Sequence, residues 1–115
     1  MNLGILYVEI KNNYEEKIKN DEWYFSKFRE SVLSNTDEKN CFFNIETVIG
    51  IILNEKDIFL VDELIVLLSD LIRKSQTTEI PKVLSDNLDA LDDKFKSDDF
   101  QKKMWEEIKD YYYIT

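Results

Sequence analysis

The hydrophobic positions of the chain are densest between residues 57 and 72, where the sequence is DIFLVDELIVLLSDLI. At 100° per residue, eight apolar side chains of this stretch fall on one arc of roughly 160°. A surface helix usually buries a stripe of about 100°, so we predict a helix that is covered from more than one side. At about 15 residues it is too short to span a membrane, and as a strand it would place acids on both faces. The eight side chains are Leu60, Val61, Leu64, Ile65, Leu67, Leu68, Leu71 and Ile72.

The N-terminal residues 2–19 also repeat their apolar side chains with a helical period. Residues 4–10, GILYVEI, are rich in β-branched and aromatic residues, so a short edge strand over residues 3–10 is the alternative. Because the period continues past Ile10, a helix is favoured, with Asn12-Asn13 as the point where it could break. The apolar arc of about 120° consists of Leu3, Leu6, Tyr7, Ile10, Tyr14 and Ile18.

Two further helices are predicted before the central one. Asn20-Asp21 supplies an N-cap for a helix that runs to about Leu33, and residues 34–40, SNTDEKN, have the composition of a loop. Residues 42–54 are rich in β-branched side chains, and Gly50 weakens a helix there by about 1 kcal/mol. A helix is still predicted, because Asn44 can cap it and the next helix follows at once.

Two helices are predicted after the central one. Pro81 suits the first turn of a helix that continues to residue 95, and Ser97-Asp98 suits the cap of a helix over residues 98–113. The buried faces are predicted to be Leu84, Leu88, Leu91 and Phe95 in the first helix, and Phe100, Met104, Ile108 and Tyr111, widened by Trp105 and Tyr112, in the second.

Length and composition agree with a single helical domain over residues 1–115. A hydrophobic fraction of 43% supports a core, whereas two glycines and one proline are too few for the turns of an all-β protein. We therefore predict an all-α fold, a bundle of five or six helices, with stacked helical hairpins as the alternative arrangement.

The net charge of −9 limits the partners that the protein can bind. The acidic excess is strongest in residues 78–115, with 10 acids against 6 bases. Nucleic acids and anionic membranes would be repelled, because both require a basic patch. An acidic surface suits fast association with a basic protein, or it serves solubility alone.

The sequence carries no catalytic signature. It has no histidine, which most acid–base sites, nucleophilic sites and zinc sites use. Cys41 is the sole cysteine, so we interpret it as a small buried side chain. The N-terminus lacks the basic region of a signal peptide. We expect a cytosolic protein that is not an enzyme and binds no cofactor.

The first candidate site is a set of aspartates in the helix predicted over residues 81–95. Asp86, Asp89 and Asp93 project within about 60° of one another, opposite the apolar face, with Asp92 beside them. Calcium needs oxygen ligands that converge from a loop, whereas these side chains would radiate outward, so no metal is expected. The cluster is either a solvated face or a partner-binding face, since like charges on one stripe cost stability unless something offsets them.

The second candidate site is an acidic stripe on the central helix. It contains Asp62, Glu63 and Asp70, with Phe59 and Val66 among them. Exposed apolar side chains flanked by acids can form a binding hot spot for a basic protein. The alternative is that Phe59 and Val66 lie under a neighbouring helix and the acids line its edges.

Three segments give the chain a resemblance to bacterial immunity proteins, the cognate inhibitors of polymorphic and contact-dependent toxins. The segments are VDELIVLLSDLI, TEIPKVLSDNLDALDDKF and MWEEIKDYYYI, and the resemblance covers roughly residues 42–113 without a fixed motif. It implies tight binding to a toxin domain, often a basic nuclease, that an acidic surface would attract and occlude. A helical adaptor or regulatory module with a different partner is the alternative.

Overall fold

The computed structural model describes residues 2–114, and within them the chain forms eight helices and no strand. The predicted all-α class is confirmed, but the number of helices exceeds the five or six expected. In chain order they are α1 (Leu3–Lys11), α2 (Tyr14–Asn20), α3 (Tyr24–Ser34), α4 (Cys41–Asn54), α5 (Ile58–Ser75), α6 (Lys82–Asp86), α7 (Leu88–Phe95) and α8 (Asp99–Tyr111).

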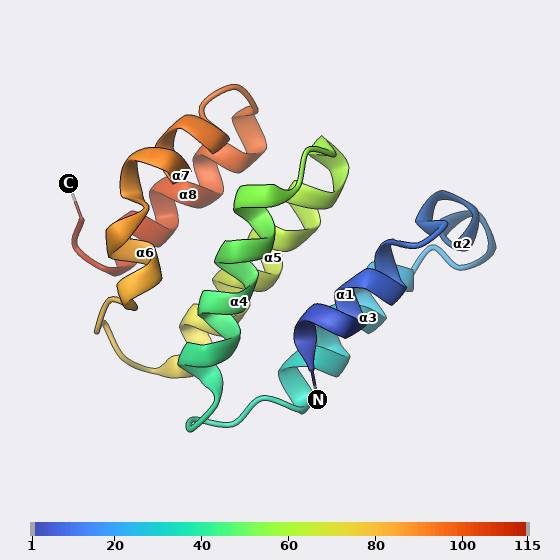
Figure 1. The fold of residues 1–115 in the computed structure, drawn as a ribbon, viewed down its shortest axis with the longest axis horizontal. Helices are drawn as coiled ribbons and strands as arrows, with labels where there is room; N and C mark the ends of the chain where they lie inside the picture. The colour runs from blue at the N-terminus through green and yellow to red at the C-terminus, as the bar shows by residue number, and fades with distance from the viewer. Residues whose placement is uncertain (1, 115) are drawn as a thin grey trace.

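The first additional helix results from a break at the predicted weak point in residues 2–19. Asn13 has a φ of 55°, in the left-handed region that asparagine tolerates better than most residues. The helix therefore ends at Lys11, and a new one begins at Tyr14 in a different direction (Figure 1). Residues 3–10 are helical, so the alternative of an edge strand is wrong.

The second additional helix results from Asn87, which divides the segment predicted as one helix over residues 81–95. The side-chain amide of Asn87 donates to the carbonyl of Val83 (2.7 Å), and its φ of −122° departs from helical geometry. The short α6 ends at Asp86 and α7 begins at Leu88. Asparagine side chains compete for backbone groups in this way, which is why they favour helix ends.

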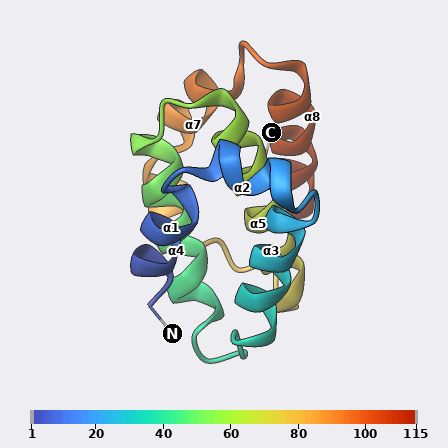
Figure 2. The same cartoon turned by 90° about the vertical axis from the view of Figure 1, so that its right-hand side faces the viewer.

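Helices α4 and α5 lie side by side in the middle of the molecule, and α2 lies at one end of it (Figure 1). The middle pair, α4 and α5, is flanked on one side by α1 with α3 and on the other by α6, α7 and α8. Seen from the side, α1 and α4 lie on one face of the molecule, and α3 and α8 lie towards the other (Figure 2). The result is a flat domain of 41 × 33 × 19 Å, with a radius of gyration of 13.7 Å.

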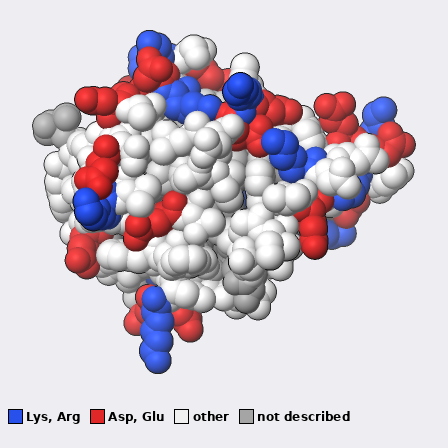
Figure 3. Space-filling model, in the orientation of Figure 1, with Lys and Arg blue, Asp and Glu red and all other residues white. Residues whose placement is uncertain are grey.

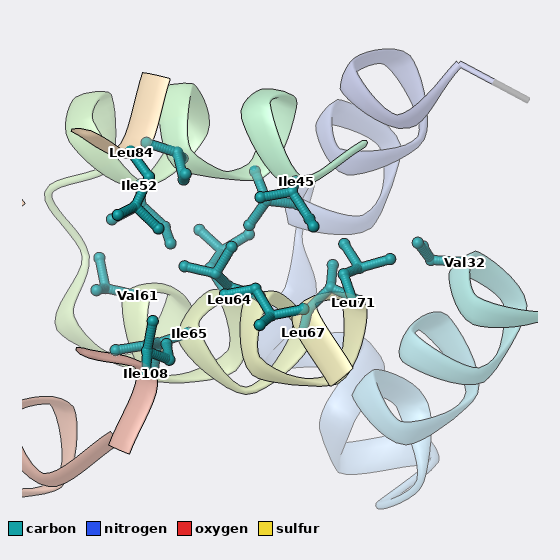
Figure 4. Packing of buried hydrophobic residues seen from close by; sticks show 14 of the residues in the cluster. Val32, Ile45, Ile52, Val61, Leu64, Ile65, Leu67, Leu71, Leu84 and Ile108 are labelled. Carbon is teal, nitrogen blue, oxygen red and sulfur yellow. The ribbon is translucent and has the colours of Figure 1, made fainter. Parts of the chain in front are cut away.

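Helix α5 is the centre of the core, as its broad apolar arc predicts. All eight predicted side chains are buried, each at most 2% exposed. Leu64 and Leu71 face Ile45 and Ile52 of α4 across the core, and α8 adds Ile108 from the other side (Figure 4). The remaining apolar positions of α3, α6 and α7 close the edges of this cluster.

The caps were predicted correctly in α8 and incorrectly in α3 and α4. Helix α3 begins at Tyr24 with Trp23 at its N-cap position, and Asp21 instead lies at the C-cap of α2. Asp98 caps α8, where its carboxylate accepts from the backbone N–H of Gln101 (3.0 Å). Asn44 does not cap α4. It lies inside the helix, buried, and donates to the hydroxyl of Thr36 (2.9 Å), while the helix begins at Cys41.

The buried face of α8 is rotated relative to the prediction. Phe100 is 46% exposed, and Gln101 is buried in its place. The Gln101 amide donates to the carboxylate of Asp62 (2.8 Å) and to the carbonyl of Ile58 (3.3 Å), so a polar group is buried without losing its hydrogen bonds. Trp105, Ile108 and Tyr112 are buried as predicted.

Candidate functional site

The first predicted acidic cluster lies on the outer side of α6 and α7. Asp86 is on α6, and Asp89, Asp92 and Asp93 are on α7. All four are exposed. The break at Asn87 means that they do not share one straight helical stripe, but they remain neighbours on two consecutive helices.

Most of these aspartates have a lysine partner. Such exposed pairs contribute about 0–1 kcal/mol each, so a charged partner protein could replace the lysine at little cost. Within residues 2–114, Asp89 has no ion pair. The pairs are Asp86 with Lys82 (2.7 Å), Asp93 with Lys96 (2.6 Å) and Asp92 with Lys109 (3.1 Å).

Asp92 differs from the other three because it joins α7 to α8. Its carboxylate accepts from the indole N–H of Trp105 (2.6 Å) and from the ammonium of Lys109 (3.1 Å). The hydrogen bond from Trp105, with that from Lys109, lowers the pKa of Asp92. Part of the predicted cluster is therefore used to hold two helices together.

The second predicted cluster is half-buried along α5. Asp62 binds Gln101 of α8, and Glu63 forms an ion pair with Arg29 of α3. Burial raises the pKa of both carboxyl groups above their usual values. Asp70 is also half-buried and forms no ion pair within the part of the chain that the structure describes. Two of these three acids thus bind neighbouring helices of the same chain.

Phe59 and Val66, the apolar residues of this stripe, are partly covered. Phe59 is 42% exposed, and its ring stacks on Tyr14 with 5.5 Å between centroids and lies edge-on to Phe25 at 5.6 Å. Val66 is half-buried. The stripe around Phe59 serves mainly to hold α2 and α3 against α5.

Exposed apolar side chains at the start of α5 and α8 were missed by the sequence analysis. Ile58 is 63% exposed and Phe100 is 46% exposed, and Gln101, next to Phe100, binds the carbonyl of Ile58. Asp98 and Asp99 directly precede Phe100. The sequence gives no signal for the exposure of Phe100, because the cap at Asp98 fixes where the helix starts and leaves open which of its faces is buried.

Glu55 is a buried carboxylate that the sequence pattern does not single out. It is 5% exposed and accepts from the Tyr7 hydroxyl, the Lys11 ammonium (2.9 Å) and the backbone N–H of Lys56 (3.0 Å). Burial alone would raise its pKa, but these hydrogen bonds outweigh burial and lower it to about 2. A carboxylate so fully bonded is a poor general acid or base, so its role is structural.

The thiol of Cys41 also has a structural role. Cys41 is buried, and its thiol donates to the carbonyl of Leu71 (3.2 Å); burial raises its pKa. Among residues 2–114, no group of three His, Cys, Asp or Glu side chains could hold a metal ion. In the same residues, no helix has the length and apolar character needed to cross a membrane.

No protein-family model, curated protein or solved structure matches the chain.

Proposed function

We propose that the protein is a cytosolic immunity protein, which binds and neutralises the toxin domain of a bacterial polymorphic or contact-dependent toxin system. Its target is a basic domain such as a nuclease, and it needs no cofactor and catalyses no reaction. The observation that supports this proposal best is the set of exposed aspartates on α6 and α7 in a chain of net charge −9.

The aspartates are arranged so that a basic partner could bind them without unfolding the protein. Asp89 has no ion pair among the described residues, and the side chains of the Asp93–Lys96 pair are 73% and 69% exposed. Arg and Lys side chains of a partner could therefore displace exposed lysines at a cost of about 1 kcal/mol or less per pair. Inhibition would follow from coverage of the toxin's active site, and the negative field would accelerate the encounter.

The first test is co-expression with the product of the gene that lies directly upstream. We expect this product to arrest growth alone, and we expect growth to recover and the two proteins to co-purify when both are expressed. A neighbouring toxin that still kills cells, without co-purification, would show that the proposed function is wrong.

The second test locates the interface with a charge-matched pair of variants. One variant carries Asp86→Lys, Asp89→Lys and Asp93→Lys. The control carries Glu15→Lys, Glu16→Lys and Glu22→Lys, three exposed acids near α2. Both variants change the net charge from −9 to −3, since each reversal adds two charges.

We expect the aspartate variant to weaken toxin binding at least tenfold more than the control, with unchanged circular dichroism for both. A tenfold loss corresponds to about 1.4 kcal/mol of binding free energy. Equal losses would show that only the net charge matters. Unchanged affinity of the aspartate variant would place the interface elsewhere, with Asp62, Glu63 and Asp70 as the next candidates.

A further inference from the structure

A groove of about 390 Å³ lies between α1 and α4, on the face seen in Figure 1. The two helices run side by side in the same direction (Figure 1, Figure 2). The ion pair between Lys11 and Glu55 closes one end of the groove. Its walls are small or apolar side chains, chiefly Gly4, Val8, Thr47, Gly50 and Ile51.

Apolar side chains in the groove wall, and next to residues that line it, are strongly exposed. Val8, in the wall, is 68% exposed, and Ile5, next to Gly4, is 61% exposed. Phe43 is 71% exposed and lies one helical turn before Thr47 on the same side of α4. Exposed apolar side chains on one face of a molecule can form a protein–protein contact.

Gly50 is not explained by the packing of one chain. It lies inside α4, where glycine costs about 1 kcal/mol relative to alanine. Its φ is not positive, and a Cβ atom placed on it would meet no atom within 4 Å. The missing side chain therefore leaves the backbone of α4 open to close approach from outside the molecule.

The charge of this face limits what can approach it. The middle of the face is uncharged in Figure 3, whereas acids and lysines lie around it. Of the described residues that line the groove, only Lys11 and Glu55 are charged, and they neutralise each other (2.9 Å). A basic partner would gain no electrostatic attraction here, but two copies of net charge −9 need a neutral surface on which to meet.

We propose that this face binds a second copy of the chain. The two α4 helices pack antiparallel across a two-fold axis close to Thr47. Phe43 lies four residues before Thr47 and Ile51 four residues after it, each about 6 Å along the helix axis. Phe43 of each copy thus lies opposite Ile51 of the other and enters its groove, and Gly50, which has no side chain, allows the helices to approach closely. Such a self-complementary contact is the usual form of a two-fold dimer.

The dimer does not depend on the proposed function. It uses none of the aspartates of α6 and α7, so toxin binding and self-association can be tested separately. If the co-expression test fails, the proposed dimer is unaffected. If the chain proves monomeric, the proposed function is unaffected.

The first experiment measures the mass of the full chain by sedimentation over a wide range of concentration. We expect a species of twice 13.8 kDa that dissociates on dilution. Phe43→Glu should raise the dissociation constant at least tenfold, because it places two carboxylates in an apolar contact. The matched control is Ile58→Glu, a side chain of similar exposure (63%) that does not line the groove, which should leave the dissociation constant unchanged.

A chain that is monomeric at every concentration would overturn the proposal, as would equal effects of the two substitutions. If the wild-type chain is monomeric and Phe43→Glu abolishes toxin binding, the groove binds the toxin and the proposal is wrong. Circular dichroism of both variants shows whether either has unfolded.

The second experiment uses a cysteine at the predicted axis. Thr47→Cys should form an intermolecular disulfide under mild oxidation, because Cβ atoms close to a two-fold axis can reach the roughly 4 Å that a disulfide requires. Lys103→Cys, an exposed position on α8, is the control. The native Cys41 is 1% exposed and should not react. Cross-linking of Thr47→Cys no faster than that of Lys103→Cys would rule out this arrangement.

Discussion

Glu55 connects three parts of the fold through a single residue. Its buried carboxylate binds Tyr7 and Lys11 of α1, and its backbone carbonyl accepts from the ammonium of Lys94 on α7. The residue itself lies in the turn between α4 and α5. Because the anionic form makes these contacts, the stability of the domain should depend on the charge of Glu55.

The first prediction concerns pH. The pKa of Glu55 falls from 4.5 to about 2 on folding, so its contribution is fully present above 4.5 and is lost as pH falls through about 2. The shift corresponds to about 3 kcal/mol. In urea titrations at neutral pH, Glu55→Gln should lower the free energy of unfolding by about 2–3 kcal/mol.

The control for this prediction is to compare the unfolding free energies of wild type and Glu55→Gln at each pH. Other carboxylates titrate over the same range, but they are common to wild type and Glu55→Gln. The difference in unfolding free energy should therefore shrink as the solution is acidified from pH 4.5 towards 2. A difference that is constant over this range would mean that the charge of Glu55 does not stabilise the fold.

The second prediction separates structure from binding within the acidic cluster. Asp92→Asn removes a charged acceptor from Trp105 and Lys109 and should lower the unfolding free energy by about 1 kcal/mol, a modest value because the side chain is 50% exposed. Asp89→Asn should leave thermal stability unchanged, since Asp89 is exposed and has no ion pair among residues 2–114. Equal melting temperatures for the two variants would contradict the role of Asp92 at the α7–α8 contact.

At the scale of elements, the sequence predicts a helix where its apolar pattern is strong. The arc of α5 identified all eight of its large buried aliphatic side chains, because a helix with a wide apolar stripe must turn that stripe towards the core. The pattern was less informative at Asn87, where a side-chain bond to Val83 ended a helix within a continuous apolar period. On α8, the exchange of Phe100 for Gln101 in the buried face could not be predicted, because burial of Gln101 depends on Asp62, a residue distant in the sequence.

The same limit applies to the candidate site. The sequence identified the aspartates of α6 and α7, and the structure places all four at the surface. It could not show that Asp62 and Glu63 are engaged by Gln101 and Arg29, since those partners come from other helices. Nor could periodicity show that Phe43 is exposed at a groove, because the groove exists only once α1 packs on α4.

The third prediction concerns α4 in the monomer. Gly50→Ala should raise the free energy of unfolding by about 0.5–1 kcal/mol, because alanine favours the helix and its methyl group would meet no other atom within 4 Å. The measurement is urea denaturation at concentrations low enough to exclude association. A loss of stability there would mean that the surroundings of Gly50 are tighter than the structure shows. The self-association proposed above adds that the same methyl group should weaken the dimer.

At the scale of the whole molecule, charge is distributed unevenly over a flat domain. The exposed aspartates lie on the α6–α7 side, whereas the groove between α1 and α4 is neutral. A neutral contact and a charged contact respond differently to salt, because dissolved ions screen exposed charges and leave apolar contacts intact. The two proposed interfaces can therefore be distinguished by ionic strength.

The last prediction is that salt slows association with the toxin without hastening dissociation. The Debye length falls from about 30 Å at 0.01 M salt to about 8 Å at 0.15 M, so the field of the chain reaches a partner only at low salt. We expect the association rate constant to fall at least tenfold over this range, while the dissociation rate constant changes by less than about twofold. Surface plasmon resonance measures both. The variant with Asp86, Asp89 and Asp93 reversed should associate slowly even at low salt, whereas self-association should persist in high salt. An association rate that does not change with salt would show that the acidic surface does not attract the toxin, and the apolar side chains Ile58 and Phe100 would then be the next residues to test.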